Sequence, residues 1–205
     1  MLIELLMMAA AQGAPARLPP VDQCSRDPGF KAFHASLESA VAKRDGDAFL
    51  KLLAPDVLVN FGGENGKAAF AKQWEVKSST SPLWAQMDTV LRLGCARVDS
   101  VRVMPSLAGQ FDGDNDVDVF ELSVVTAPGA RLRKSHDVDG ATIATLAWDV
   151  VRPIAHEGDA WTKVRLIDGR EGWLRTDELR SPLDYRAVAE KRKGKWMITA
   201  FVAGD

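Results

Sequence analysis

The sequence predicts an α+β protein with a compact all-β unit in its second half. Short alternating strands and turn signals crowd the stretch from Phe120 to Leu179, whereas helical periodicity dominates the chain before it. Two more alternating segments follow near the C-terminus, where a lone hairpin would be only marginally stable. We therefore expect this hairpin to complete the helical first half, which leaves the all-β unit inserted into that half or packed on it.

The composition excludes some classes of partner. The chain has 205 residues, enough for one sizeable core or two modest ones. Its formal net charge is −2, with acidic and basic residues mostly interspersed. A balance of this kind does not indicate binding to nucleic acid or to an anionic membrane surface, and we expect neither.

Residues 1–16, MLIELLMMAAAQGAPA, are interpreted as a secretory signal peptide. They contain an apolar stretch followed by an A-x-A site at Ala14 and Ala16. Against this, no Lys or Arg precedes the apolar stretch and Glu4 interrupts it, so a helical start packed on the protein is the alternative. The stretch is too short to span a bilayer. We expect a periplasmic or secreted protein without stable membrane insertion.

Cys24 and Cys95 are the only cysteines. An even count in an exported chain indicates a disulfide, and the loop that it closes is long enough for about 4 kcal/mol in the chain-entropy model. Two free thiols are the alternative, since sequence alone does not show whether the two residues meet.

The first half is read as helix, helix, strand, helix, helix and strand. Asp27 and Pro28 suit the start of the first helix, whose apolar face recurs at helical spacing: Phe30, Phe33, Leu37, Ala40 and Val41. The elements expected after it are a short helix at 48–53, a strand at 57–61, helices at 65–74 and 82–93, and a strand at 98–104.

The all-β unit contains the clearest hairpin. Val164 and Leu166 alternate with charged residues, and Asp168-Gly169 then supplies a tight turn. Gly172 in the returning strand indicates a bulge or a close backbone approach. A second hairpin is expected at 185–190 and 196–202, joined by the basic turn 191–195.

The second half resembles a bacterial SH3 (SH3b) domain. The resemblance rests on GARLRKS at 129–135, ATL at 144–146, WTKVR at 161–165 and DGREGW at 168–173, with Arg131 where the family usually has Asn. It implies a small SH3-like β-barrel at 119–181, of a kind often found in envelope proteins, where it binds peptidoglycan or peptide or serves as a spacer.

The flanking parts resemble an NTF2-like (SnoaL-like) domain. The residues that carry this resemblance are RDGDAFLKLLAPDV at 44–57, the FGG passage that begins at Phe61, and GKWMITAF at 194–201. The resemblance implies that 24–118 and 182–205 together form one α+β domain.

A candidate ligand groove lies in the all-β unit. Trp148, Trp161 and Trp173 offer large, rigid contact area for a glycan or peptide, with Arg133 and Arg165 as polar contacts at the rim. Packing of the tryptophans in the core or edge of the barrel is the alternative.

No metal or cofactor is expected. The histidines His34, His136 and His156 lack metal-ligand spacing and are interpreted as solvated. The acidic run 112–118 fails the calcium-loop template, because Val117 stands at the glycine position and Ser123 at the glutamate position.

The leading functional hypothesis is a non-enzymatic cell-envelope binding or scaffolding protein, with peptidoglycan or an envelope protein as ligand. The alternative is a small-molecule-binding or isomerase-type pocket in the α+β half, for which Asp56, Asn60 and Tyr185 offer suitable side chains. A third possibility is an intracellular protein whose barrel is purely structural.

Overall fold

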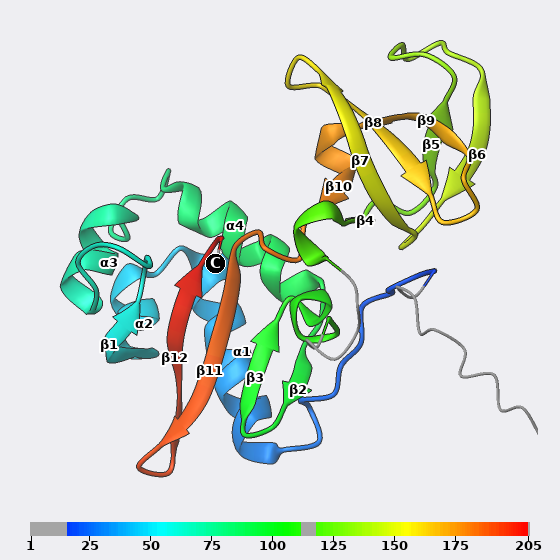
Figure 1. Cartoon of the computed structure of the whole chain (residues 1–205). Helices are drawn as coiled ribbons and strands as arrows, with labels where there is room; N and C mark the ends of the chain where they lie inside the picture. Colours follow the sequence, from blue (N-terminus) through cyan, green and yellow to red (C-terminus); the bar gives the residue numbers. More distant parts are fainter. Residues whose placement is uncertain (1–15, 112–117, 205) are drawn as a thin grey trace, which may run out of the picture.

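The computed structural model describes residues 16–111 and 118–204, which form two β-sheets and a layer of helices. Figure 1 shows the helices gathered on the first sheet and the second sheet standing apart from both. The α+β class predicted from the sequence is confirmed. Within the described residues, no helix has the length and apolar character needed to cross a bilayer.

The first sheet has five strands in the order β1-β12-β11-β3-β2. β1 runs parallel to β12, and the other neighbours are antiparallel. The strands are β1 (Leu53–Leu58), β2 (Ala96–Val98), β3 (Val101–Met104), β11 (Arg186–Arg192) and β12 (Lys195–Val202). The C-terminal hairpin β11–β12 therefore occupies the middle of a sheet whose outer strands come from the first half of the chain.

Four helices pack on this sheet and enclose the larger core. They are α1 (Pro28–Lys43), α2 (Gly46–Lys51), α3 (Lys67–Gln73) and α4 (Pro82–Arg92). Asp27 caps α1 by accepting the amides of Gly29 and Phe30, and Ser81 caps α4. Aromatic rings fill the space between helices and sheet, among them Phe30, Phe49, Phe70, Trp74, Trp84 and Phe201.

The local sequence explains the shape of the central hairpin. Lys193 and Gly194 both adopt positive φ, 48° and 81°, as a two-residue turn between twisted strands requires. A bulge lies at Thr199, since Val188 pairs with Ala200 and Ala189 pairs with Ile198. Before the bulge, the buried side chains of β12 are at even-numbered positions, as at Ile198. After it the alternation shifts by one residue, so that Phe201 is buried.

The second sheet has seven strands in the order β10-β4-β7-β8-β9-β5-β6. These are β4 (Ser123–Val125), β5 (Ala130–Arg133), β6 (Thr142–Leu146), β7 (Val150–Glu157), β8 (Trp161–Leu166), β9 (Glu171–Arg175) and β10 (Leu179–Arg180). In the described part of the chain, the 3-10 turns η2 (Val119–Glu121) and η3 (Thr176–Glu178) lie next to these strands in sequence, whereas η1 (Ser106–Gly109) contacts β2 and β3 of the first sheet. All seven strands come from the chain between β3 and β11, which are neighbours in the first sheet.

The expectation of a closed SH3-like barrel at 119–181 is corrected by this strand order. In the described part of the chain, the outermost strands β10 and β6 pair only with β4 and β5 respectively, so the sheet is open. β10 has only two residues, so it offers little backbone for pairing with a further strand. The expected close approach at Gly172 is present, because a Cβ there would lie 2.7 Å from the Leu132 side chain.

Other boundaries also differ from expectation. The first strand begins at Leu53 and includes Pro55, which the sheet tolerates because β1 is an edge strand. The single strand expected at 98–104 is the hairpin β2–β3, which turns at Asp99 with φ 47°. The signal-peptide interpretation of 1–16 and the acidic run 112–118 lie outside the described ranges except for Ala16 and Asp118.

Candidate functional site

The segment before α1 is fixed to the start of β2. A disulfide joins Cys24 to Cys95, whose Cα atoms are 5.9 Å apart. Two backbone hydrogen bonds flank it: the Gln23 amide donates to the Cys95 carbonyl at 2.9 Å, and the Cys95 amide donates to the Val21 carbonyl at 2.8 Å. Gly94 permits this approach, since a Cβ there would lie 2.4 Å from the Val21 carbonyl oxygen.

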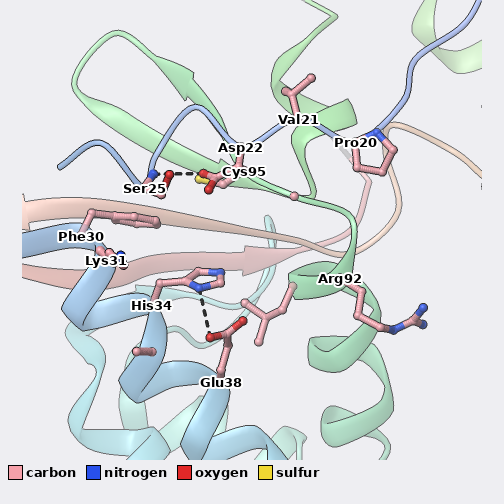
Figure 2. A pocket seen from close by; sticks show the side chains of 13 residues that line it. Pro20, Val21, Asp22, Ser25, Phe30, Lys31, His34, Glu38, Arg92 and Cys95 are labelled. Carbon is pink, nitrogen blue, oxygen red and sulfur yellow. Dashed lines mark hydrogen bonds and ion pairs between the residues drawn. The ribbon is translucent and has the colours of Figure 1, made fainter. Parts of the chain in front are cut away.

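A pocket of about 440 Å³ lies between this segment, α1 and the end of α4. Figure 2 shows the segment crossing above the side chains that project from α1. Apolar side chains of Phe30, Val21 and Leu91 supply much of the lining. The polar and charged side chains of the lining are Asp22, Ser25, Lys31, His34, Glu38 and Arg92.

His34 and Glu38 form an interacting pair in this pocket. They stand one turn apart on α1, where side chains at i and i+4 meet, and His34 Nδ1 lies 3.5 Å from Glu38 Oε2. The His34 side chain is 24 % exposed and its ring centroid lies 5.9 Å from that of Phe30. Among the described residues His34 Nε2 has no hydrogen-bond partner, so this nitrogen is free to meet a bound molecule.

Asp22 supplies a fixed negative charge at the upper rim. Its Oδ1 accepts the amides of Cys24 and Ser25, each at 3.0 Å. A hydrogen bond from the Ser25 side chain, aided by these amides, lowers the pKa of Asp22 below its ordinary value. Asp22 is therefore ionised at neutral pH, and Figure 2 shows it beside Ser25.

This arrangement suits a small molecule with an apolar body and at least one polar group. The volume falls within the range of about 300–1,000 Å³ that is typical of small-molecule sites. An imidazole with one nitrogen beside a carboxylate and the other free has the elements of a proton acceptor or donor. The described residues contain no group of three or more potential metal ligands.

The residues predicted for a ligand groove are partly brought together in the second sheet. Trp161 pairs with Arg175, Lys163 with Trp173, and Arg165 with Glu171, so the two tryptophans and Arg165 lie on one face. Arg133 joins that face because it pairs with Trp173. The arrangement places four of the five predicted residues on a common surface.

Their surroundings differ from an open groove. Trp161 is 8 % exposed and lies under the Arg175 guanidinium, whose Cζ is 5.6 Å from the ring centroid. Trp173 is half-buried and contacts the His136 ring edge-on at 5.0 Å. Arg165 is bound to Glu171.

Trp148 lies elsewhere, in the turn between β6 and β7. It has φ 64°, and its backbone carbonyl accepts the Leu18 amide at 2.8 Å.

The acid/base candidates predicted from the sequence lie outside the pocket and make other contacts. Asp56 forms a surface ion pair with Arg192 at 2.6 Å, and Asn60 hydrogen-bonds within its own loop. The Tyr185 ring stacks on Phe201 at 5.1 Å. His34, interpreted from the sequence as solvated, lines the pocket together with the carboxylates of Asp22 and Glu38. The spacing of Phe30, His34 and Glu38 in the sequence indicates that they share one face of a helix. It does not indicate a pocket, because the opposite wall comes from residues near Cys95.

Comparison with known proteins assigns no family. No family model matches the chain, and no curated protein matches it. A putative ketosteroid isomerase from Shewanella frigidimarina aligns with 87 % of this chain and 96 % of its own, at 8 % identity and a TM-score of 0.32. An NTF-2 like protein of unknown function from Shewanella oneidensis aligns with 88 % and 99 %, at 12 % identity and a TM-score of 0.31.

A protein with a cystatin-like fold from Nostoc punctiforme aligns with 89 % of this chain and 93 % of its own, at 12 % identity and a TM-score of 0.26. Scores of this size assign neither family nor activity, so the functional conclusion rests on the geometry of this chain.

Removal of the disulfide should destabilise the protein. The bond closes a loop between residues 71 positions apart. The double variant Cys24→Ala/Cys95→Ala should lose about 4 kcal/mol of unfolding free energy in urea denaturation, because the unfolded chain regains loop freedom. An unchanged denaturation midpoint, or two reactive thiols in the native parent protein, would show that the bond does not form.

Proposed function

We propose that this chain is a small-molecule-binding protein and that its ligand occupies the pocket around His34. The observation that carries the proposal is one hollow, lined by both apolar and polar side chains, that holds a half-buried imidazole with a carboxylate partner. Phe30 and Leu91 receive the apolar body of the ligand, and His34 Nε2 meets its polar group. This function corresponds to the second hypothesis from the sequence, a small-molecule-binding or isomerase-type pocket, and differs from the leading hypothesis of envelope binding.

Proton transfer at the bound ligand is the chemistry that this pair supports. Glu38 lies beside Nδ1 and favours the tautomer that carries its proton there, which leaves the Nε2 lone pair directed away from Glu38. Nε2 then accepts a proton from the ligand, and Glu38 stabilises the imidazolium that results. An isomerase-type reaction, in which a proton leaves one ligand atom and returns to another, fits this arrangement.

Blocking the pocket should abolish binding. Ala35 is exposed and lines the pocket, so Ala35→Trp fills the hollow without disturbing the core. Naphthoate, naphthol and naphthylmethylamine share one apolar body and differ in charge, which makes them suitable probes. Saturation-transfer NMR should detect at least one of them on the parent protein and none on Ala35→Trp. The ¹⁵N shifts of the His34 ring should move when the probe binds.

Ala32→Trp is the matched control, because Ala32 is exposed on the same helix and lies outside the pocket lining. It should bind the same probes as the parent. Equal probe binding by parent and Ala35→Trp, or no binding by the parent, would contradict the proposal.

Envelope binding through the second sheet is the second candidate function. The cross-strand register supports it by placing Trp161, Trp173, Arg133 and Arg165 on one face. Peptidoglycan or an envelope protein would then contact the accessible part of Trp173. The periplasmic or secreted location on which this depends stays a prediction from residues 1–16.

Sedimentation with purified peptidoglycan tests the second candidate. Trp173→Ala should weaken binding about threefold or more, because it removes an aromatic contact surface. Phe61→Ala is the control, since Phe61 is 53 % exposed and lies before the second sheet in the chain. If the parent protein stays in the supernatant, or if both variants bind equally well, peptidoglycan is not the ligand of this face.

A further inference from the structure

A second hollow lies beside the N-terminal segment, and most of the charged side chains that line it are arginines. It has a volume of about 710 Å³ and lies between residues 22–27 and the β2–β3 hairpin. Its lining comprises Asp22, Gln23, Cys24, Arg26, Asp27, Arg97 and Arg102. The lining thus contains three guanidinium groups and two carboxylates.

Arg102 is the buried member of this group. It is 7 % exposed, and its Cζ lies 4.9 Å from the centroid of the Trp196 ring. Nη1 donates to the neighbouring Val101 carbonyl at 2.9 Å, whereas Nε is buried and has no partner among the described residues. Burial of a cation with an unused donor is unfavourable unless another group compensates the charge.

No carboxylate of the described residues forms an ion pair with Arg102, although the negative charge of Asp27 acts on it from farther away. The cross-strand partner of Arg102 is Arg97, which carries the same charge. Burial, and secondarily the charge of Arg97, lower the pKa of Arg102. Two like charges directly opposite each other on adjacent strands are destabilising.

The two aspartates of the hollow are engaged by the backbone. Asp27 Oδ1 accepts the amides of Gly29 and Phe30, and Asp22 Oδ1 accepts those of Cys24 and Ser25. These bonds hold both carboxylates at the turns that they cap, and the two carboxylates offset only part of the charge of the three guanidinium groups, so the hollow keeps a net positive charge.

We infer that this hollow binds a small oxyanion of the phosphate or carboxylate class, held by Arg97 and Arg102 with Arg26 at the rim. Guanidinium groups match such anions through paired N–H donors. The bound anion offsets the net positive charge of the hollow and accepts hydrogen bonds from guanidinium N–H groups of its lining. This site shares Asp22 with the small-molecule pocket around His34 but has its own arginines, and its existence does not depend on the function proposed for that pocket.

NMR of the arginine side chains tests the inference. Inorganic phosphate and acetate are titrated separately at constant ionic strength, with chloride as the balancing anion, and the Nε–Hε signals of Arg97 and Arg102 are followed. We expect saturable shifts with phosphate or acetate, and the arm that saturates at lower concentration identifies the preferred class. Shifts that chloride reproduces, or no saturation with either anion, would overturn the inference.

Three variants locate the site. Arg102→Gln and Arg97→Gln should each raise the dissociation constant about tenfold or more, through loss of charged hydrogen bonds. Arg97 is exposed, so its variant tests the site even if Arg102→Gln is unstable. Arg131→Gln is the control, because Arg131 is exposed on the second sheet, and it should bind as the parent does. Unchanged affinity in both Arg97→Gln and Arg102→Gln would also overturn the inference.

Discussion

Both candidate sites depend on the attachment of one short segment to the start of β2. The Cys24–Cys95 disulfide and the backbone bonds of Cys95 fix residues 21–24, and Gly94 makes the close approach possible. The His34 pocket lies between this segment and the helices, whereas the arginine hollow lies between it and the β2–β3 hairpin. Asp22 contributes to both linings, so the position of the segment determines the shape of each.

The same segment also reaches the second sheet. The Leu18 amide donates to the Trp148 carbonyl, and the Leu18 side chain packs with Val124 and Val150 in a small separate core. The chain thus contacts both sheets before α1 begins. The first sheet provides a rigid base for the sites because its central hairpin is held on both sides, by β1 next to β12 and by β3 next to β11.

Local signals predicted much of the fold. The cap at Asp27, the apolar spacing of α1 and the Lys193-Gly194 turn are encoded by neighbouring residues, and their elements appear close to the expected positions. Closure of the second sheet was predicted wrongly, because it depends on whether β10 and β6 meet, and their short motifs do not encode this. The His34 pocket was missed for a similar reason. Its walls lie about 70 residues apart in sequence, and only the path of the segment past Gly94 brings them together.

Comparison of the oxidised and fully reduced protein tests the dependence of both sites on this segment most directly. The dissociation constants of a naphthalene probe that binds the parent protein, and of whichever of phosphate and acetate binds more tightly, are measured on both forms under conditions in which the reduced protein stays folded. Both constants should rise together on reduction, because the segment loses its covalent attachment and both linings loosen. Unchanged affinity for both probes in the reduced protein would contradict it.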